Sequence, residues 1–153
     1  MSSLSDLAGA LPLLLPKAIA WAESQERRAR RRGRLLSPGE RALAVAVGVA
    51  EPERVRVLLV AGLPEPFDAA LRAAGRDAGL LGPGMTGMTL GHAVFLRPGP
   101  GFRRTLSHEL RHVAQYEENG GIAGFLPAYL RQVLEFGYSS APLEDDARRH
   151  EAD

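Results

Sequence analysis

Hydrophobic and polar positions predict helices that alternate with short strands. Apolar residues dominate Leu7 to Ala22, which predicts a packed N-terminal helix or arm, and a helix should run from about Lys17 to Arg32. A second helix starts at Ser37-Pro38-Gly39-Glu40, because serine can cap it, proline fits the first turn and glutamate completes a capping box. We expect this helix to end near Val47.

Two segments have the pattern of strands. Arg54 to Val60 begins with alternation and becomes fully apolar, which is typical of a half-buried or central strand. Met88 to Arg97 contains strand-forming residues and ends abruptly at a Pro-Gly-Pro-Gly turn. Between the two strands we expect a loop over residues 61–66 and a helix around Phe67 to Ala74.

The last third of the chain is predicted to be helical. Leu106, Leu110 and Val113 recur at helical spacing between about Arg104 and Glu118. Residues 122–136 form the next predicted helix, although Pro127 is awkward inside it. A third helix opens at Ser140-Ala141-Pro142-Leu143-Glu144, with the proline in its first turn.

The composition fits one globular domain and narrows the chemistry. The 153 residues are 45% hydrophobic, and the net charge of +1 gives no overall field that would attract nucleic acid or membrane. Cysteine is absent, so a metal site must use His, Asp or Glu. We expect residues 1–36 to form a helical arm that makes one compact unit with a domain over residues 37–153.

The N-terminal apolar run also bears on localisation. The run is shorter than the length that a helix needs to span a bilayer. A secretory signal has basic residues before its apolar run, whereas Lys17 lies toward the end of this one. We therefore expect no transmembrane segment and a cytoplasmic protein, with a membrane-surface role as the alternative.

Six arginines cluster between Arg27 and Arg34. Cations in the last turn of a helix suit its dipole, and Gly33 can end that helix. Contact with phosphate or an anionic surface is the alternative. We favour the helix end, because no aromatic residue is interleaved with the arginines.

The chemically informative residues are His108-Glu109-Leu110-Arg111-His112, an HExxH motif. Residues four apart share one face of a helix, so His108 and His112 can direct two imidazoles at one metal ion. Glu109, one step round the helix, can reach a water on that metal and act as its base. Two of the four histidines of the chain fall in this pattern, which favours metal binding over coincidence.

A zinc site needs at least one further protein ligand and an open position for water. Glu117 and Glu118 lie on the HExxH helix itself and cannot easily fold back onto the same ion, so a second helix should bring the ligand. The remaining candidates are His92, His150, Glu135, Glu144, Asp145, Asp146, Glu151 and Asp153.

The run HELRHVAQY followed by PLEDDAR resembles the gluzincin branch of the zinc metallopeptidases, and more narrowly the small bacterial domains called minigluzincins. In that branch a later helix carries a Glu ligand, often within ExxA, and Glu144 with Ala147 matches this pattern. The resemblance covers about residues 88–150. It implies an α+β, zincin-like domain with a small sheet, an HExxH helix and a C-terminal helix carrying the third ligand.

The same resemblance implies the roles of individual residues. Zn2+ would be bound by His108, His112 and Glu144, and Glu109 would be the general base. The strand Met88 to Arg97 would be a sheet edge that pairs with an extended peptide substrate.

The sequence also departs from the family pattern. Several gluzincins carry Asp or Asn four residues after the ligand Glu, where it orients a metal-binding His, and this chain has Arg148 there. Asp145 or Asp146 could take that part, and Asp146 is the alternative third ligand. A residue that stabilises the developing oxyanion is expected among Tyr116, Tyr129, Tyr138, His150 and Arg103, with Tyr138 suggested by its position just before the Glu144 helix.

These features predict a zinc-dependent hydrolase, most simply a metallopeptidase acting on a peptide or protein substrate. The alternative is a non-catalytic zincin-like module that keeps the metal for stability and binds a protein partner. A nucleic-acid or membrane adaptor built on residues 17–34 is a third hypothesis.

Overall fold

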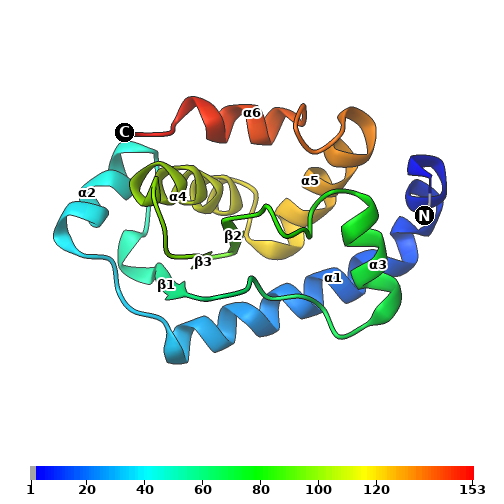
Figure 1. Ribbon diagram of the computed structural model, residues 1–153, viewed down its shortest axis with the longest axis horizontal. Coiled ribbons are helices and arrows are strands. Elements are labelled where there is room, and N and C mark those ends of the chain that lie inside the picture. The colour runs from blue at the N-terminus through cyan, green and yellow to red at the C-terminus, as the bar shows by residue number, and fades with distance from the viewer. Residues whose placement is uncertain (1–2) are drawn as a thin grey trace.

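The computed structural model describes residues 3–153, which form an α+β fold of six α-helices and one three-stranded sheet (Figure 1). The expected α+β class is therefore confirmed. The elements are α1 (Leu4–Arg32), α2 (Pro38–Ala46), a 3-10 turn (Pro52–Arg54), β1 (Arg56–Leu59), α3 (Ala69–Asp77), β2 (Gly87–Leu90), β3 (Ala93–Leu96), α4 (Phe102–Glu118), α5 (Ile122–Phe136) and α6 (Pro142–Arg149).

The sheet is mixed, with strand order β1-β3-β2. Strand β3 runs parallel to β1 and antiparallel to β2, and all four of its residues are buried. Its side chains alternate between two core clusters: Val94 and Leu96 pack with α2 and α4, whereas Ala93 and Phe95 pack with α1 and α5. Helices thus cover both faces, which explains why the sequence of β3 is apolar throughout.

The prediction of one strand from Met88 to Arg97 is wrong, because this segment is the hairpin of β2 and β3. Gly91 has a φ of +67° in the two-residue turn, a conformation that glycine adopts at little cost. The carboxylate of Glu26, on α1, accepts a hydrogen bond from the backbone N–H of His92 at 2.7 Å. Of the two hairpin strands only β2 lies at an edge of the sheet, and β1 is the opposite edge, partly covered by the bridge between Arg34 and Val57.

Helix α1 begins earlier than predicted and is continuous from Leu4 to Arg32. Ser3 and Asp6 form a capping box at its start, and Gly33 donates its backbone N–H to the carbonyl of Ala29 at its end. Pro12 and Pro16 lie inside the helix, both on its exposed face, so the carbonyls that they leave without an N–H donor can reach water.

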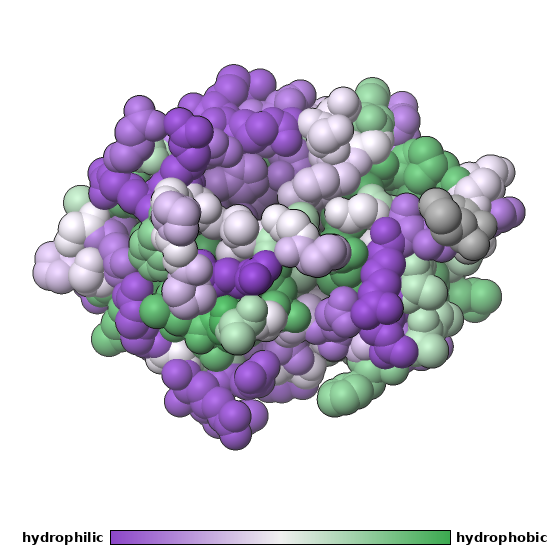
Figure 2. Space-filling view, in the orientation of Figure 1, coloured by the Kyte–Doolittle hydropathy of each residue, from purple (hydrophilic) through white to green (hydrophobic). Residues whose placement is uncertain are grey.

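Helix α1 is also the one helix within residues 3–153 that is long and apolar enough to cross a membrane by length and composition. This is weak evidence, because core helices and N-terminal signals pass the same test. Its Ala22 and Ala29 are buried against the sheet and α5. Apolar side chains remain exposed around its N-terminal half, whereas hydrophilic side chains gather over its arginine-rich end and over α6 (Figure 2).

We predict that Gly91→Ala destabilises the fold by about 2 kcal/mol, because an L-residue is strained at positive φ and its Cβ would collide with the Glu26 carboxylate. Urea unfolding measures the change. Gly84→Ala is the matched control, since nothing lies within 4 Å of its added Cβ, and it should change stability by less than about 0.5 kcal/mol. Equal effects of the two substitutions would contradict this account of the hairpin.

Candidate metal centre

Helix α4 presents the HExxH motif toward α6. The rings of His108 and His112 lie one turn apart, with their centroids separated by 4.9 Å. His112 is buried, and 13% of the His108 side chain is exposed. Leu106, Leu110 and Val113 pack into the core on the neighbouring positions of α4, which sets the rotation of the helix and hence the direction of both imidazoles.

Helix α6 brings Glu144 between the two imidazoles. One carboxylate oxygen lies 3.1 Å from Nε2 of His108, and the other lies 2.9 Å from Nε2 of His112. Glu144 is buried in the first turn of α6. Ala147, one turn further on, is fully buried, and its small side chain lets α6 pack closely against the protein interior.

The Nδ1 atom of His108 has a separate partner, Oε2 of Glu151, at 2.9 Å. A carboxylate only accepts hydrogen bonds, so this Nδ1 carries the hydrogen. Nε2 of His108 donates to Glu144 in the metal-free protein, and it is the nitrogen that a metal ion would take after displacing that proton, as in the carboxylate–histidine–zinc arrangement. Glu151 follows α6 in the C-terminal segment, so the same end of the chain supplies both the proposed ligand and its histidine-orienting group.

Gln115 orients the imidazole of His112, as Glu151 orients that of His108. Its amide Nε2 donates to the Leu143 carbonyl at 2.9 Å and to Oδ2 of Asp146 at 2.8 Å. The amide oxygen is thereby turned toward Nδ1 of His112, at 2.8 Å, and Nδ1 must donate to it. Nε2 of His112 therefore also faces Glu144, where it donates to the carboxylate in the metal-free protein and would offer its lone pair to a metal ion that displaced its proton.

The other acidic residues of α6 lie outside this group. Asp146 pairs with Nε of Arg111 at 2.7 Å and acts on His112 only through Gln115. Asp145 is exposed and pairs with Arg148. The structure thus brings Glu144, and not Asp146, together with His108 and His112.

Glu109 lies beside the histidines and not among the carboxylates that touch them. Its Oε1 accepts a hydrogen bond from the hydroxyl of Thr89, on β2, at 2.9 Å. Burial raises the pKa of Glu109, although the nearby imidazolium charges oppose this shift. A Cβ at Gly87 would lie 2.9 Å from Cγ of Glu109, so a glycine is required for this close approach of β2 and α4.

The charges in the group are strongly coupled. Burial would raise the pKa of Glu144, but its hydrogen bonds with His108 and His112 outweigh burial and hold that pKa well below the usual range. Burial would lower the pKa of His108, but the hydrogen bond with Glu144 and the charge of Glu109 raise it to about 9. The pKa of His112 is raised by the same two carboxylates.

The donor set fits a divalent metal ion. One ligand atom from each of His108, His112 and Glu144 lies within 4.8 Å of the others. Two imidazoles and one carboxylate are a known zinc ligand set, and tetrahedral bonds of about 2.0–2.2 Å would separate the donor atoms by about 3.3 Å. At present each imidazole faces a different oxygen of Glu144, at 3.1 and 2.9 Å, so the side chains would have to turn for one oxygen to share an ion with both nitrogens.

A second group of this kind, formed by Glu51, His92 and Glu117, has a different character. The Glu117 carboxylate accepts hydrogen bonds from the backbone N–H groups of Ala50 and Glu51, at 2.8 and 3.0 Å, and lies 2.9 Å from Nε2 of His92. The oxygens of Glu117 therefore already have hydrogen-bond partners, and these bonds connect α4 to the turn before β1 and to the hairpin.

The residues considered for oxyanion stabilisation are differently placed. Four of them already donate within the protein: Tyr129 to Glu144 of the site itself at 2.7 Å, Tyr116 to the Thr89 carbonyl, His150 to the Asp146 carbonyl and Arg103 to the Asp153 carbonyl. Tyr138 lines the cavity whose wall also includes Glu109, His112 and Glu144. Burial and the charges of Glu144 and Glu109 raise the pKa of Tyr138, so its hydroxyl stays protonated and can donate.

Sequence reasoning missed Gln115 and Thr89 as contributors to the site, and it named Glu151 only as a possible metal ligand. Gln115 follows His112 by three residues on the same helix face, which is a usable signal. Thr89 and Glu151 come from distant segments, and only the packing of β2 and of the C-terminal segment against α4 brings them to Glu109 and His108.

Comparisons with protein-family models, with curated proteins and with solved structures found no match.

We predict that the metal-free protein loses stability as pH rises from about 6.5 to about 9. The pKa of His108 is raised on folding, so its proton stabilises the fold fully below the unfolded value of 6.5, and this contribution disappears as pH passes through 9. The loss should be on the order of 2 kcal/mol. Urea unfolding in the presence of a chelator, at several pH values, measures it.

His108→Gln is the companion variant, because it lacks the titrating proton. Its stability should depend less on pH across the same window. An identical pH dependence in the two proteins would show that His108 does not carry the effect.

Proposed function

We propose that the protein is a zinc-dependent hydrolase of amide bonds, of the metallopeptidase type. The observation that carries this proposal is the convergence of two Nε2 atoms and one buried carboxylate, with a further buried carboxylate, Glu109, next to them. His108, His112 and Glu144 would hold the ion. The resemblance of the sequence to gluzincins points in the same direction.

The chemistry of the site can be assigned to its residues. Zinc held by these residues would supply a coordinated water of lowered pKa and a Lewis acid for the substrate carbonyl. Glu109 accepts the proton of the attacking water and later delivers it to the leaving amine, a task suited by its raised pKa. Tyr138 donates its hydroxyl hydrogen to the carbonyl oxygen as negative charge develops there.

The edge of β2 supports a zincin-like arrangement within the α+β fold. Arg97 donates its backbone N–H to Thr86, and in an antiparallel pair the hydrogen-bonded positions alternate. The backbone groups of Gly87 and Thr89 therefore point away from β3. Gly87 itself packs closely against the Glu109 side chain, so an amide held at its backbone groups would lie near that carboxylate.

We retain the cytoplasm as the proposed location and a peptide-like amide as the proposed substrate. A non-catalytic metal-binding module remains the competing function, and the same experiment separates the two. Stoichiometric zinc with turnover of an amide substrate supports the hydrolase, zinc without turnover supports the module, and a protein that takes up no divalent metal contradicts both.

Glu109→Gln should retain zinc and lose hydrolysis, because an amide cannot accept the proton of water. Glu144→Ala should instead lower zinc affinity itself, because it removes a proposed ligand. Metal analysis and an amide-cleavage assay on the two purified variants measure both effects. Loss of zinc in Glu109→Gln, with retention in Glu144→Ala, would reverse the assigned roles.

Gln115→Ala should weaken zinc binding about 10–100-fold, because the hydrogen bond that orients His112 is lost. Competition with a chromophoric chelator measures the affinity. Gln25→Ala, on α1 and away from the site, is the control and should leave it unchanged. Unaltered zinc affinity in a folded Gln115→Ala protein would show that the amide does not position the imidazole.

A further inference from the structure

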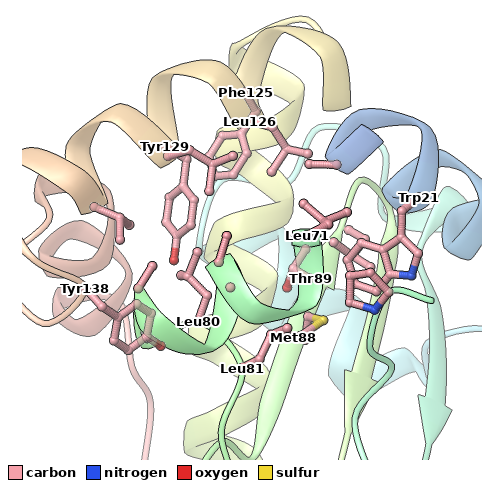
Figure 3. A pocket seen from close by; sticks show the side chains of 18 of the residues that line it. Trp21, Leu71, Leu80, Leu81, Met88, Thr89, Phe125, Leu126, Tyr129 and Tyr138 are labelled. Atoms are coloured by element: carbon pink, nitrogen blue, oxygen red, sulfur yellow. The ribbon is translucent and has the colours of Figure 1, made fainter. Parts of the chain in front are cut away.

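A cavity of about 180 Å3 begins at the candidate metal centre and extends away from it between α1, α3, α5 and β2. Glu109, His112 and Glu144 form part of its wall. The rest of the wall is almost entirely apolar, and Figure 3 shows Leu71, Leu80, Leu126 and other side chains surrounding the space between Tyr138 on one side and Trp21 on the other.

The cavity is long relative to its volume. Its wall includes residues of α1 from Leu7 to Trp21, which spans about 21 Å at 1.5 Å per residue. A compact cavity of about 150 Å3 holds a single benzene ring. A similar volume distributed along several helical turns is therefore a narrow channel, which suits a linear chain better than a ring.

Polar groups lie at one end of this channel. Glu109, His112, Glu144, Tyr129 and Tyr138 surround the metal end, whereas α1 and α3 contribute mainly leucine and alanine along the remainder. A peptide backbone placed there would lose its hydrogen bonds with water and find few replacements, at a cost of a few kcal/mol for each group. A hydrocarbon chain has no such groups to satisfy.

The edge of β2 also offers few free backbone groups that could form hydrogen bonds with a long peptide. The hydroxyl of Tyr116 already donates to the Thr89 carbonyl at 3.0 Å, one of the outward-pointing groups of this short strand. Gly87 alone keeps both backbone groups next to the catalytic end. The structure thus favours recognition of one amide at Gly87 and of an apolar chain beyond it.

Helix α3 forms a thin wall over the channel. None of its residues is buried, and it turns Leu71 and Ala74 toward the channel. The ion pair between Lys17 and Asp68, at 2.8 Å, connects its start to α1 and is largely solvent-exposed. Such a wall can yield to an entering chain at little energetic cost.

We propose that this channel binds an unbranched hydrocarbon chain of the substrate, so that the amide cleaved is that of a fatty acyl group. The identity of the cleaved bond rests on the proposed function, whereas the chain-binding site does not. The zinc-bound water and Glu109 would break the C–N bond to give the fatty acid and the free amine, with water as the co-reactant.

Straight-chain hydroxamic acids test the channel, because the hydroxamate can bind zinc while the chain enters the cavity. Trp21 is the single tryptophan of the protein and lines the channel, so its fluorescence reports occupancy. From acetohydroxamic through hexanohydroxamic to decanohydroxamic acid, affinity should rise about fourfold for each added methylene while the chain remains within the channel. Affinity independent of chain length would overturn the proposal.

A ring-bearing probe distinguishes an acyl chain from an aromatic amino-acid side chain. We expect 3-phenylpropanohydroxamic acid to bind more weakly than nonanohydroxamic acid, which has the same number of carbons. Tighter binding of the ring compound would identify a side-chain pocket of a peptidase and reject the acyl chain.

Two adjacent alanines of α3 provide matched variants. Ala74 lines the channel, whereas Ala73 is exposed. Ala74→Phe should weaken decanohydroxamic acid at least tenfold and leave acetohydroxamic acid unchanged, which would also show that the zinc site is intact. Ala73→Phe should change neither, and equal effects of the two variants would contradict the assigned position of the chain.

Failure of the proposed function is recognised separately. With the metal removed, decanamide should still alter Trp21 fluorescence, and Ala74→Phe should suppress this change. Chain binding without zinc uptake would reject the hydrolase and keep the channel, whereas zinc-dependent cleavage of short peptides with no effect of chain length would reject the channel and keep the hydrolase.

Discussion

The buried carboxylate of Glu144 between two imidazoles is the interaction on which the site depends. A buried charge is tolerated only when it is paired, and Glu144 is paired by Nε2 of His108 and of His112 and by the hydroxyl of Tyr129. This arrangement requires α6 to approach α4 closely, which the buried Ala147 permits. Without that contact, the two histidines of α4 would face each other with no shared anion.

The sheet packs against the other side of α4 and so stabilises the contact between α4 and α6. Packing of α4 on β3 orients the HExxH face, and the hydrogen bond between Thr89 and Glu109 ties the edge strand to the same helix. Gly87 allows the close approach of strand and helix at that point. The site is therefore built mainly on regular elements, which hold ligand geometry more accurately than loops do.

The channel beside the centre follows from the long N-terminal helix. Leu7, Leu11 and Leu14 of α1 belong to one apolar stripe, and the thin wall of α3 closes the space over them. The segment expected to be an arm thus supplies part of the substrate-binding surface that we propose. The arginine-rich end of the same helix lies far from the channel. Just beyond that end, the guanidinium of Arg34 forms an ion pair with the Glu40 carboxylate at 2.7 Å.

Local signals in the sequence determined most of the helices and the chemistry of α4. The i, i+4 histidines share a face because of helix geometry alone, and Ser37 and Pro142 mark helix starts through capping and the fixed φ of proline.

The division of residues 88–97 into a hairpin was decided by the Gly91 turn and by the hydrogen bond of that turn with Glu26, a residue far away in the sequence. The sequence favoured Glu144 and left Asp146 as the alternative, and the tertiary structure places Glu144 against the imidazoles while Arg111 and Gln115 of α4 hold Asp146 away from them. Which of two neighbouring carboxylates faces the imidazoles depends on the rotation of one helix against another, and that rotation is set by packing across the whole core.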